Sequence, residues 1–111
     1  MESLDHYRQV IRELLHAYAQ YRPAQGDVQI EVIIDEAQDH YELIYVGWNG
    51  PYRIPGSVLH LDIRDGKVWI QHDGTEEGVA ERLVSAGIPR DRIVLAFKAP
   101  DIRPHTGFAT A

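Results

Sequence analysis

Apolar residues recur along this chain with two different periods, and the change of period separates helices from strands. Between residue 3 and about residue 21 they return every three or four positions, which is typical of a helix with one apolar face. Ser3 can cap its start, and Pro23 with Gly26 ends it. Tyrosines at this spacing are far more often core packing than a ligand site. The stripe consists of Leu4, Tyr7, Ile11, Leu14, Leu15, Tyr18 and Tyr21.

After this helix the apolar period falls to two, as in strands. The segment 27–35 and the segment that starts at His40 alternate in this way on either side of a polar loop, 36–39. If Asp35 faces His40 across that loop, one face of the resulting hairpin is apolar and belongs to the core. That face carries Val28, Ile30, Val32, Ile34, Tyr41, Leu43 and Tyr45.

The dipeptide Asp65–Gly66 predicts a second hairpin, because it favours a two-residue type I′ turn that fixes the strand register. Counting back from the turn pairs Arg64 with Lys67 at one end and His60 with Gln71 at the other. The two faces then differ sharply in polarity. The core face is Leu59, Leu61, Ile63, Val68 and Ile70, and the opposite face carries His60, Asp62, Arg64, Lys67, Trp69 and Gln71.

The remaining segments add a loop, a helix, a strand and a tail. The connection 49–56 contains two prolines, and we expect a wide loop there. Asp73 and Glu76 have the spacing of a capping box and predict the start of a second helix. The segment 92–97 follows that helical crossover as a short strand that could run parallel to its neighbour. Residues 98–111 form an irregular tail.

This order of elements predicts an α+β fold in a single domain, residues 1–111. It runs helix, four strands as two hairpins, helix, strand and tail. Both amphipathic helices most simply cover the one apolar face, which gives a two-layer sandwich with a largely antiparallel sheet of about five strands. A chain of this length buries roughly two-thirds of the surface that its unfolded form exposes.

Composition excludes several classes of function. The absence of cysteine removes disulfides, thiolate metal sites and cysteine nucleophiles.

The N-terminal segment lacks an apolar run, so we expect no signal peptide, no membrane association and a cytoplasmic location. Of the net charge of −6, the whole excess lies between Arg22 and Arg53, where six acidic residues occur without a lysine or arginine. Such a field repels phosphate backbones, so we expect no direct nucleic-acid binding by the chain alone.

Four polar residues at the second hairpin suggest a metal or acid–base site: His60, Asp62, His72 and Asp73. The register directs His60 and Asp62 to the open face, and His72 to the core face, so the four converge only if a β-bulge intervenes. No phosphate loop, nucleophile elbow or HExxH pattern is present in the sequence. We therefore expect no metal, no cofactor and no catalysis, with a metal-dependent hydrolase built on these four residues as the alternative.

The face opposite the core face, called the open face below, exposes more apolar surface than the few hundred Å² usual for soluble monomers. We therefore expect this surface to be covered. The candidates are the C-terminal tail with Phe108, a second copy of the chain, or a different protein that docks on aromatic residues surrounded by acidic ones. We weigh the last two equally. The candidate partner-binding residues are Trp48, Trp69, Ile33, Ile44, Val46, Glu31, Asp35, Glu42, His60 and Asp62.

Four segments carry a resemblance to a known family. They are ESLDHYRQVIRELLHAYAQ, DHYELIYVGWNG, VLHLDIRDGKVWIQHDGTEEGVAERLVSAGIPRDRIVLAF and TGFATA. In order and almost without gaps, they resemble the XisI-like proteins, named for the controlling factor of fdxN element excision in filamentous cyanobacteria. The resemblance covers nearly the whole chain.

The resemblance implies a small α+β protein that acts beside an XisH-like partner with an endonuclease-like fold, while a separate site-specific recombinase performs excision. It carries over no catalytic residues, and the motifs Val46–Trp48, Trp69–Glu76 and Thr106–Ala109 match without an assigned role. The acidic balance suits a protein-binding factor. We therefore expect a non-catalytic regulatory protein with an XisH-like partner and a possible homo-oligomer.

Overall fold

The computed structural model describes residues 4–20, 27–54 and 56–111. Short 3₁₀ turns at 90–92 and 103–105 accompany the regular elements. No helix in the described ranges has the length and apolar character needed to cross a membrane. The helices and strands are α1 (Leu4–Ala19), β1 (Asp27–Asp35), β2 (His40–Asn49), β3 (Tyr52–Arg53), β4 (Ser57–Arg64), β5 (Lys67–Asp73), α2 (Ala80–Ser85) and β6 (Ile93–Leu95).

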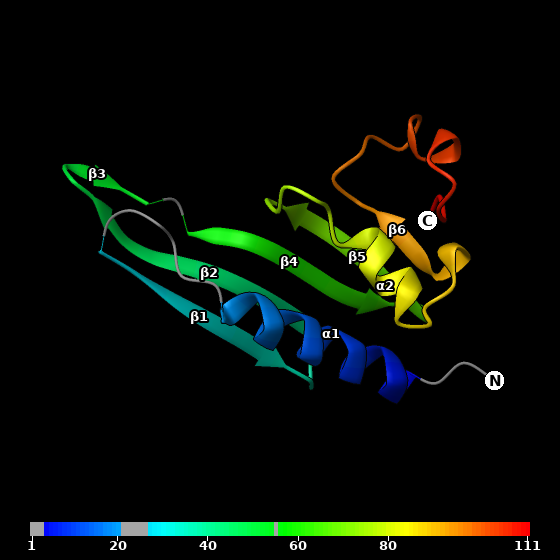
Figure 1. Ribbon diagram of the computed structural model, residues 1–111. Coiled ribbons are helices and arrows are strands. Elements are labelled where there is room, and N and C mark those ends of the chain that lie inside the picture. The colour runs from blue at the N-terminus through cyan, green and yellow to red at the C-terminus, as the bar shows by residue number, and fades with distance from the viewer. Residues whose placement is uncertain (1–3, 21–26, 55) are drawn as a thin grey trace.

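The described strands form one sheet in the order β1-β2-β4-β5-β6, with β3 paired to β2. The two hairpins, β1–β2 and β4–β5, join through an antiparallel β2–β4 pair, and β6 runs parallel to β5 after the α2 crossover. Figure 1 shows α1 and α2 on the same side of the sheet. The predicted two-layer α+β fold is confirmed, with six strands in the described chain where about five were expected.

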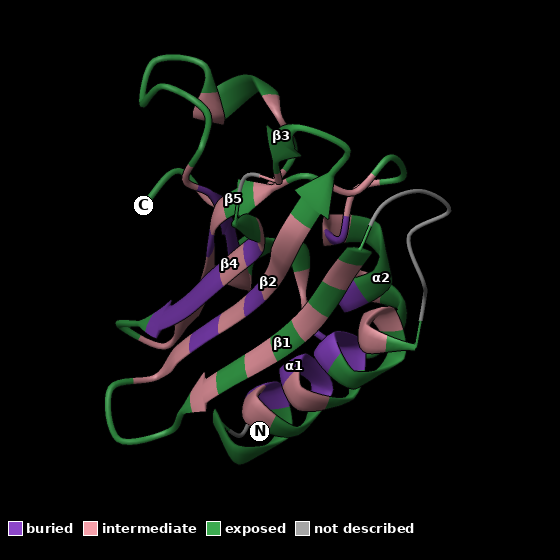
Figure 2. Cartoon of the chain, turned by 90° about the vertical axis from the view of Figure 1, so that its left-hand side faces the viewer, coloured by how far each residue is buried: buried purple, intermediate pink, exposed green. Residues whose placement is uncertain are grey.

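The core lies between this sheet and the helices. Each core-face residue predicted for the second hairpin is buried, and α1 contributes Tyr7, Ile11, Leu14 and Leu15 to the same cluster. Figure 2 shows β4 as largely buried, whereas β1 alternates between half-buried and exposed positions, because its successive side chains point to the core face and to the open face in turn. The predictions made for Ser3, Tyr21, Pro23 and Gly26 fall outside the described residues.

The first hairpin has the predicted register, with Asp35 opposite His40. The second hairpin keeps the predicted register from the Asp65–Gly66 turn as far as Leu61, and then departs from it. His60 pairs with His72 and not with Gln71, because a β-bulge inserts one extra residue in β5. His72 is accordingly exposed, so the expectation that it points into the core is wrong.

The connection 49–56 is a tight hairpin and not the wide loop expected. Gly50 adopts a φ of +60°, and Tyr52 and Arg53 pair back onto the end of β2 as β3. Pro51 tolerates this arrangement because it lies in the turn, where its missing N–H costs no sheet hydrogen bond.

The second helix starts at Ala80, six residues later than Gly74, where a capping box of Asp73 and Glu76 predicts the first helical residue. The Asp73 carboxylate accepts hydrogen bonds from the backbone N–H of Thr75 at 3.0 Å and of Val79 at 2.8 Å. Gly78, at a φ of +79°, keeps the intervening loop out of helical geometry. Asp73 therefore arranges the helix start as expected, but it does so by holding a loop together.

The tail is largely irregular, as predicted, and docks on β6 through a bridge between Ala109 and Val94. Phe108 packs against the core cluster, so it does not cover the open face. Arg103 instead reaches that face, with its guanidinium 5.9 Å from the centre of the Trp69 ring.

Candidate functional site

The open face carries an exposed apolar row on β1 and β2. Trp48 is 49% exposed and Ile33 is 39% exposed, while Ile44 and Val46 between them are half-buried. The Arg53 guanidinium from β3 lies 5.4 Å from the centre of the Trp48 ring. Apart from Arg53, the described residues leave much of Trp48 and Ile33 exposed.

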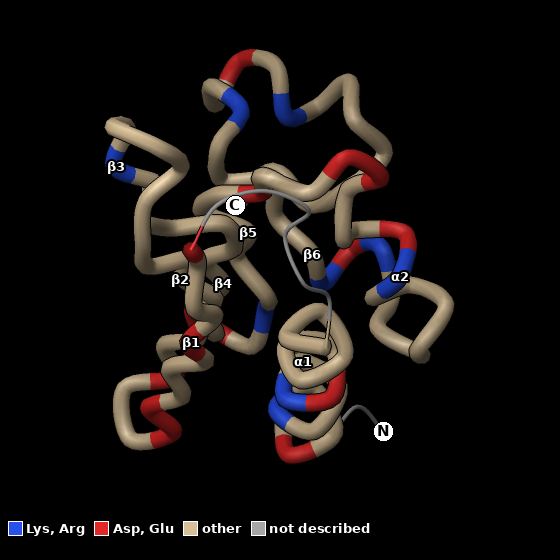
Figure 3. The backbone as a smooth tube through the Cα atoms, turned by 60° about the vertical axis from the view of Figure 1, so that its left-hand side comes forward, with Lys and Arg blue, Asp and Glu red and all other residues tan. Residues whose placement is uncertain are grey.

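Acidic residues flank this apolar row. Glu31 and Asp35 are exposed on β1, and Glu42 is half-buried on β2. Figure 3 shows the acids of the β1–β2 hairpin beside basic residues of α1. Two acids at the hairpin loop, Glu36 and Asp39, are paired with helix arginines. The negative charge that remains without such a partner is therefore concentrated on the open side of the hairpin.

Trp69 lies far from Trp48. It pairs with Asp62, which pairs in turn with His40, eight residues along β2 from Trp48. At a rise of about 3.4 Å per residue, this separation corresponds to about 27 Å. Its indole N–H donates to the Arg64 carbonyl oxygen at 3.2 Å. The two tryptophans therefore do not share one centre, and Trp69 is half-covered by its neighbours.

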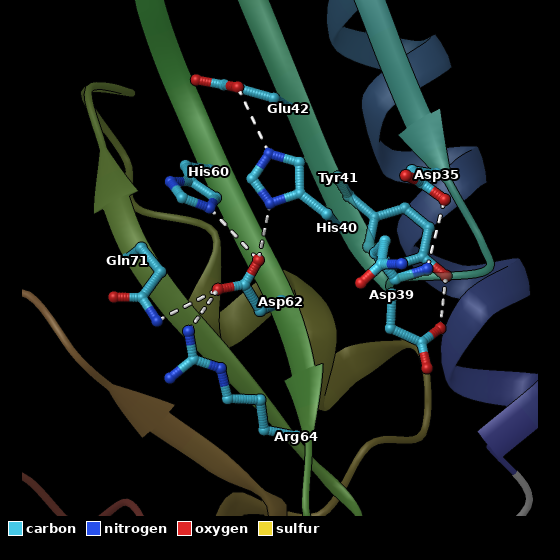
Figure 4. Close-up of polar contacts among 10 residues, drawn as sticks. Asp35, Asp39, His40, Tyr41, Glu42, His60, Asp62, Arg64 and Gln71 are labelled. Atoms are coloured by element: carbon cyan, nitrogen blue, oxygen red, sulfur yellow. Dashed lines mark hydrogen bonds and ion pairs between the residues drawn. The ribbon is translucent and has the colours of Figure 1, made fainter.

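A polar cluster centred on Asp62 occupies the Trp69 end of the open face (Figure 4). Asp62 Oδ1 lies 3.0 Å from His40 Nδ1 and 3.2 Å from His60 Nε2. The two imidazole rings meet edge to face with centroids 4.4 Å apart. The second nitrogen of His40, Nε2, lies 3.5 Å from a Glu42 carboxylate oxygen. Both imidazoles are thus aimed at the same oxygen atom.

The other oxygen of Asp62 faces β5 and the end of β4. The Gln71 amide donates to Oδ2 at 3.2 Å, and an Arg64 guanidinium nitrogen lies 3.5 Å from it. Among the described residues Asp62 is the only charged one that is buried, with 7% of its surface exposed. A buried carboxylate is costly unless it is paired and hydrogen-bonded, and these four neighbours meet that requirement.

The strand register brings the residues of this cluster together, and it explains why His40 was not among the residues predicted from the sequence. His60 and Asp62 share a face of β4, as predicted, but His72 is exposed and Asp73 holds the loop before α2. The set of four residues considered as the alternative, a metal or acid–base site, therefore does not come together. His40 joins instead, because β2 pairs with β4 so that His40 lies opposite Asp62. Alternation from Tyr41 already placed His40 on the open face, but the β2–β4 pairing was not predictable through the connection 49–56.

A second polar group, on the helix side, ties α1 to the first hairpin. Arg8 donates to both carboxylate oxygens of Asp39, at 2.8 and 3.1 Å, and the Tyr41 hydroxyl donates at 3.1 Å. The Arg8 guanidinium holds the pKa of the Asp39 carboxyl below its usual range. Burial, reinforced by Asp39, raises the pKa of Tyr41 to about 12. This group is structural and faces away from the open face.

A separate hollow of about 480 Å³ lies at the opposite end of the sheet from the polar cluster. Tyr18, Tyr45, Val58, Thr75 and Arg82 are among its lining residues. It contains no member of the apolar row or of the polar cluster, so the candidate site remains the open face.

Comparison with known proteins agrees with this architecture. The sequence model of the XisI protein family matches residues 1–110. The crystal structure of a XisI-like protein from Anabaena variabilis ATCC 29413 shares 39% identity and a TM-score of 0.91, covering 98% of this chain and 100% of that one. The structure of fdxN element excision controlling factor XisI from the same organism shares 36% identity and a TM-score of 0.84, covering 99% of this chain and 100% of that one.

No curated protein sequence matches the chain. The family match is nevertheless decisive, because it spans all but one residue and both solved relatives share the fold along their full length. This chain belongs to the XisI protein family.

Proposed function

We propose that this chain is an excision controlling factor, a non-catalytic cytoplasmic protein that regulates an XisH-like, endonuclease-fold partner in DNA element excision or a related DNA-processing system. A solved relative that is 36% identical bears the name of fdxN element excision controlling factor. The observation that carries the proposal is the apolar row on the open face, where Trp48 and Ile33 stay exposed.

The row has the composition of the centre of a protein interface. Fully burying one large apolar side chain is worth roughly 1.5 to 3 kcal/mol, and tryptophan is enriched among residues that dominate binding energy. Docking of a partner along the row, on Trp48 at one end and on Ile44 and Ile33 toward the other, would supply that burial. The row thus favours a protein partner over a small-molecule substrate.

The acids beside the row favour a partner with a basic surface. Glu31 and Asp35 are exposed next to it and have no basic neighbour within hydrogen-bonding reach among the described residues. A nuclease-like protein needs a basic surface for DNA, so complementary charge would steer association and bring the controlling factor over that surface. Regulation would then follow from competition with DNA.

The test measures whether this chain forms a complex with the XisH-like protein, and compares the wild-type chain with Trp48→Ala. We expect Trp48→Ala to weaken the complex by about 2 to 4 kcal/mol, because a central anchor is lost. Tyr52→Ala is the matched control: it removes a 74% exposed aromatic from the same hairpin, at a pair next to that of Trp48 and hence on the other side of the ribbon. Sedimentation velocity of each chain alone and of the mixtures measures the effect.

Three outcomes of this experiment contradict the proposal. One is the absence of a complex, and another is equal weakening by Trp48→Ala and Tyr52→Ala. The third is self-association of the chain that depends on Trp48 while no complex forms with the XisH-like protein, which would assign the row to a homo-oligomer.

A further inference from the structure

We propose that His40, His60 and Asp62 form a binding site for one divalent transition-metal ion of the zinc type. The site goes beyond the proposed function and can be tested on the isolated chain. It also goes against the expectation drawn from the sequence, which excluded a metal because His60 and His72 diverge. The β5 bulge instead places His72 opposite His60, and the imidazole that completes the donor set at Asp62 comes from His40.

The three donor atoms already have the spacing of metal ligands. His40 Nδ1 and His60 Nε2 lie 3.0 and 3.2 Å from Asp62 Oδ1, and one donor atom from each of the three residues lies within 4.8 Å of the others. Zinc binds imidazole nitrogen and carboxylate oxygen at about 2.0 to 2.2 Å, so neighbouring ligand atoms in a tetrahedral site are about 3.3 to 3.6 Å apart, close to these contacts. Rotation of the imidazoles can therefore bring an ion into contact with all three without moving the strands.

The surrounding contacts orient these donors as the outer shell of a metal site does. A metal-bound histidine usually directs its other ring nitrogen at a carboxylate, and His40 Nε2 faces Glu42 at 3.5 Å. Gln71 and Arg64 engage Oδ2 of Asp62, which leaves Oδ1 as the atom presented to the imidazoles. Asp62 is itself buried, so its orientation is fixed by these neighbours.

The donor set selects the class of ion. Two imidazole nitrogens and one carboxylate oxygen suit Zn²⁺, Co²⁺ and Ni²⁺, whereas Mg²⁺ and Ca²⁺ prefer oxygen ligands alone. Three protein ligands leave a fourth tetrahedral position for water or for a donor from a bound partner. Without an ion, both imidazoles must donate N–H to one carboxylate oxygen; with an ion, the same nitrogens present lone pairs. Binding measurements separate the two states.

The experiment titrates tag-free, full-length protein with CoCl₂ while its visible absorption is followed, and then displaces cobalt with ZnCl₂. We expect saturation at one ion per chain with a characteristic nitrogen–oxygen ligand-field spectrum. His40→Ala and His60→Ala should each weaken binding at least about 100-fold, because each removes a ligand. Glu42→Gln should weaken it about 10-fold through the outer shell. His72→Ala, which removes an exposed histidine opposite His60, should leave it unchanged.

Cobalt uptake that does not saturate at one ion per chain would overturn the site, as would equal affinity in the His40→Ala, His60→Ala double variant. Loss of binding in His72→Ala would overturn it as well. If an alanine variant fails to fold by circular dichroism, His60→Gln retains a hydrogen-bond donor for Asp62 without the imidazole and takes its place. Because Trp48 lies far from the cluster, failure of metal binding leaves the partner-docking experiment unaffected, and the reverse holds too.

Discussion

Asp39 shows how a single residue fixes the first hairpin against α1. It has a φ of +50°, a conformation in which aspartate and asparagine are better tolerated than most residues, and its carboxylate is clamped by Arg8 and by the Tyr41 hydroxyl. The pKa of Asp39 is lowered in the folded protein. Its charge therefore stabilises the fold above the pKa of the unfolded chain, near 3.9, and that contribution disappears as the pH falls through the folded value.

Asp39→Asn tests this directly, because it keeps the backbone preference and removes the charge. We expect the variant to lose about 1.5 to 3 kcal/mol of stability at pH 7, the usual worth of hydrogen bonds to a charged group. The difference from wild type should shrink as the pH falls below about 4, because the unfolded carboxyl becomes protonated first and the folded one follows as the pH passes its lowered pKa. Urea denaturation from pH 7 to pH 3 measures it, with Glu31→Gln on the exposed side of β1 as control. A difference that stays constant over this range would contradict the assignment.

At the scale of elements, the β1–β2 hairpin depends on Gly47, the central residue of the Val46–Trp48 motif. A Cβ at Gly47 would lie 2.0 Å from the backbone oxygen of Asp27 and 2.8 Å from Val28 Cα, on a residue with a φ of +153°. The two strands therefore approach more closely than any side chain allows. This contact positions Trp48, the next residue, on the open face.

Gly47→Ala is accordingly expected to cost more than about 3 kcal/mol of stability, through backbone clash added to strain. Gly50→Ala is the matched control: it has a φ of +60°, but a Cβ added there would meet no atom within 4 Å, so only about 1 kcal/mol of strain applies. Urea unfolding of both variants gives the comparison. Equal losses would mean that the close approach of β1 does not constrain Gly47.

An element could be predicted from the sequence where the residues that determine it are close together in the chain. The Asp65–Gly66 turn and the loop 36–39 fix register over short distances, and both hairpins follow from them. The β5 bulge leaves no local signal, because one inserted residue changes the pairing and not the composition of the strand. The β2–β4 pairing, which brings His40 to Asp62, depends on the connection 49–56. The two prolines of this connection favoured a wide loop, so the tight hairpin that forms β3 was not predicted.

At the scale of the whole molecule, the open face is divided in two. The apolar row runs from Trp48, at the β3 end of β2, to Ile33, which lies opposite Glu42, and the polar cluster lies where β2, β4 and β5 meet. The tail reaches the second region through Arg103, near Trp69, but leaves the row uncovered. The sequence identified the residues of this face, whereas their separation emerged only from the strand register. A partner can therefore engage Trp48 without contacting the polar cluster.

The distribution of charge over the molecule predicts that the isolated chain does not bind duplex DNA specifically. The net charge is −6, and the late basic residues, which offer the nearest approach to a phosphate-binding surface, are largely engaged. Arg90 pairs with Glu81 at 2.7 Å, and Arg103 donates to the backbone oxygens of Lys98 and Ala96. Phosphate binding would have to break these contacts and overcome the field of the acidic hairpin.

We therefore expect no mobility shift of duplex DNA by the protein alone at about 150 mM salt, even at micromolar concentration. The double variant Glu31→Lys, Asp35→Lys tests the physical reason, since it changes the net charge from −6 to −2 on a surface that the fold leaves exposed. It should bind DNA more readily than wild type at low salt, with an affinity that falls steeply as salt is added, because released counterions drive such binding. A sub-micromolar, salt-sensitive shift by the wild-type chain would show that its basic residues outweigh the hairpin. Any DNA contact in the assembled system is then expected to come from the basic partner, with the acidic hairpin of this chain competing for the same surface.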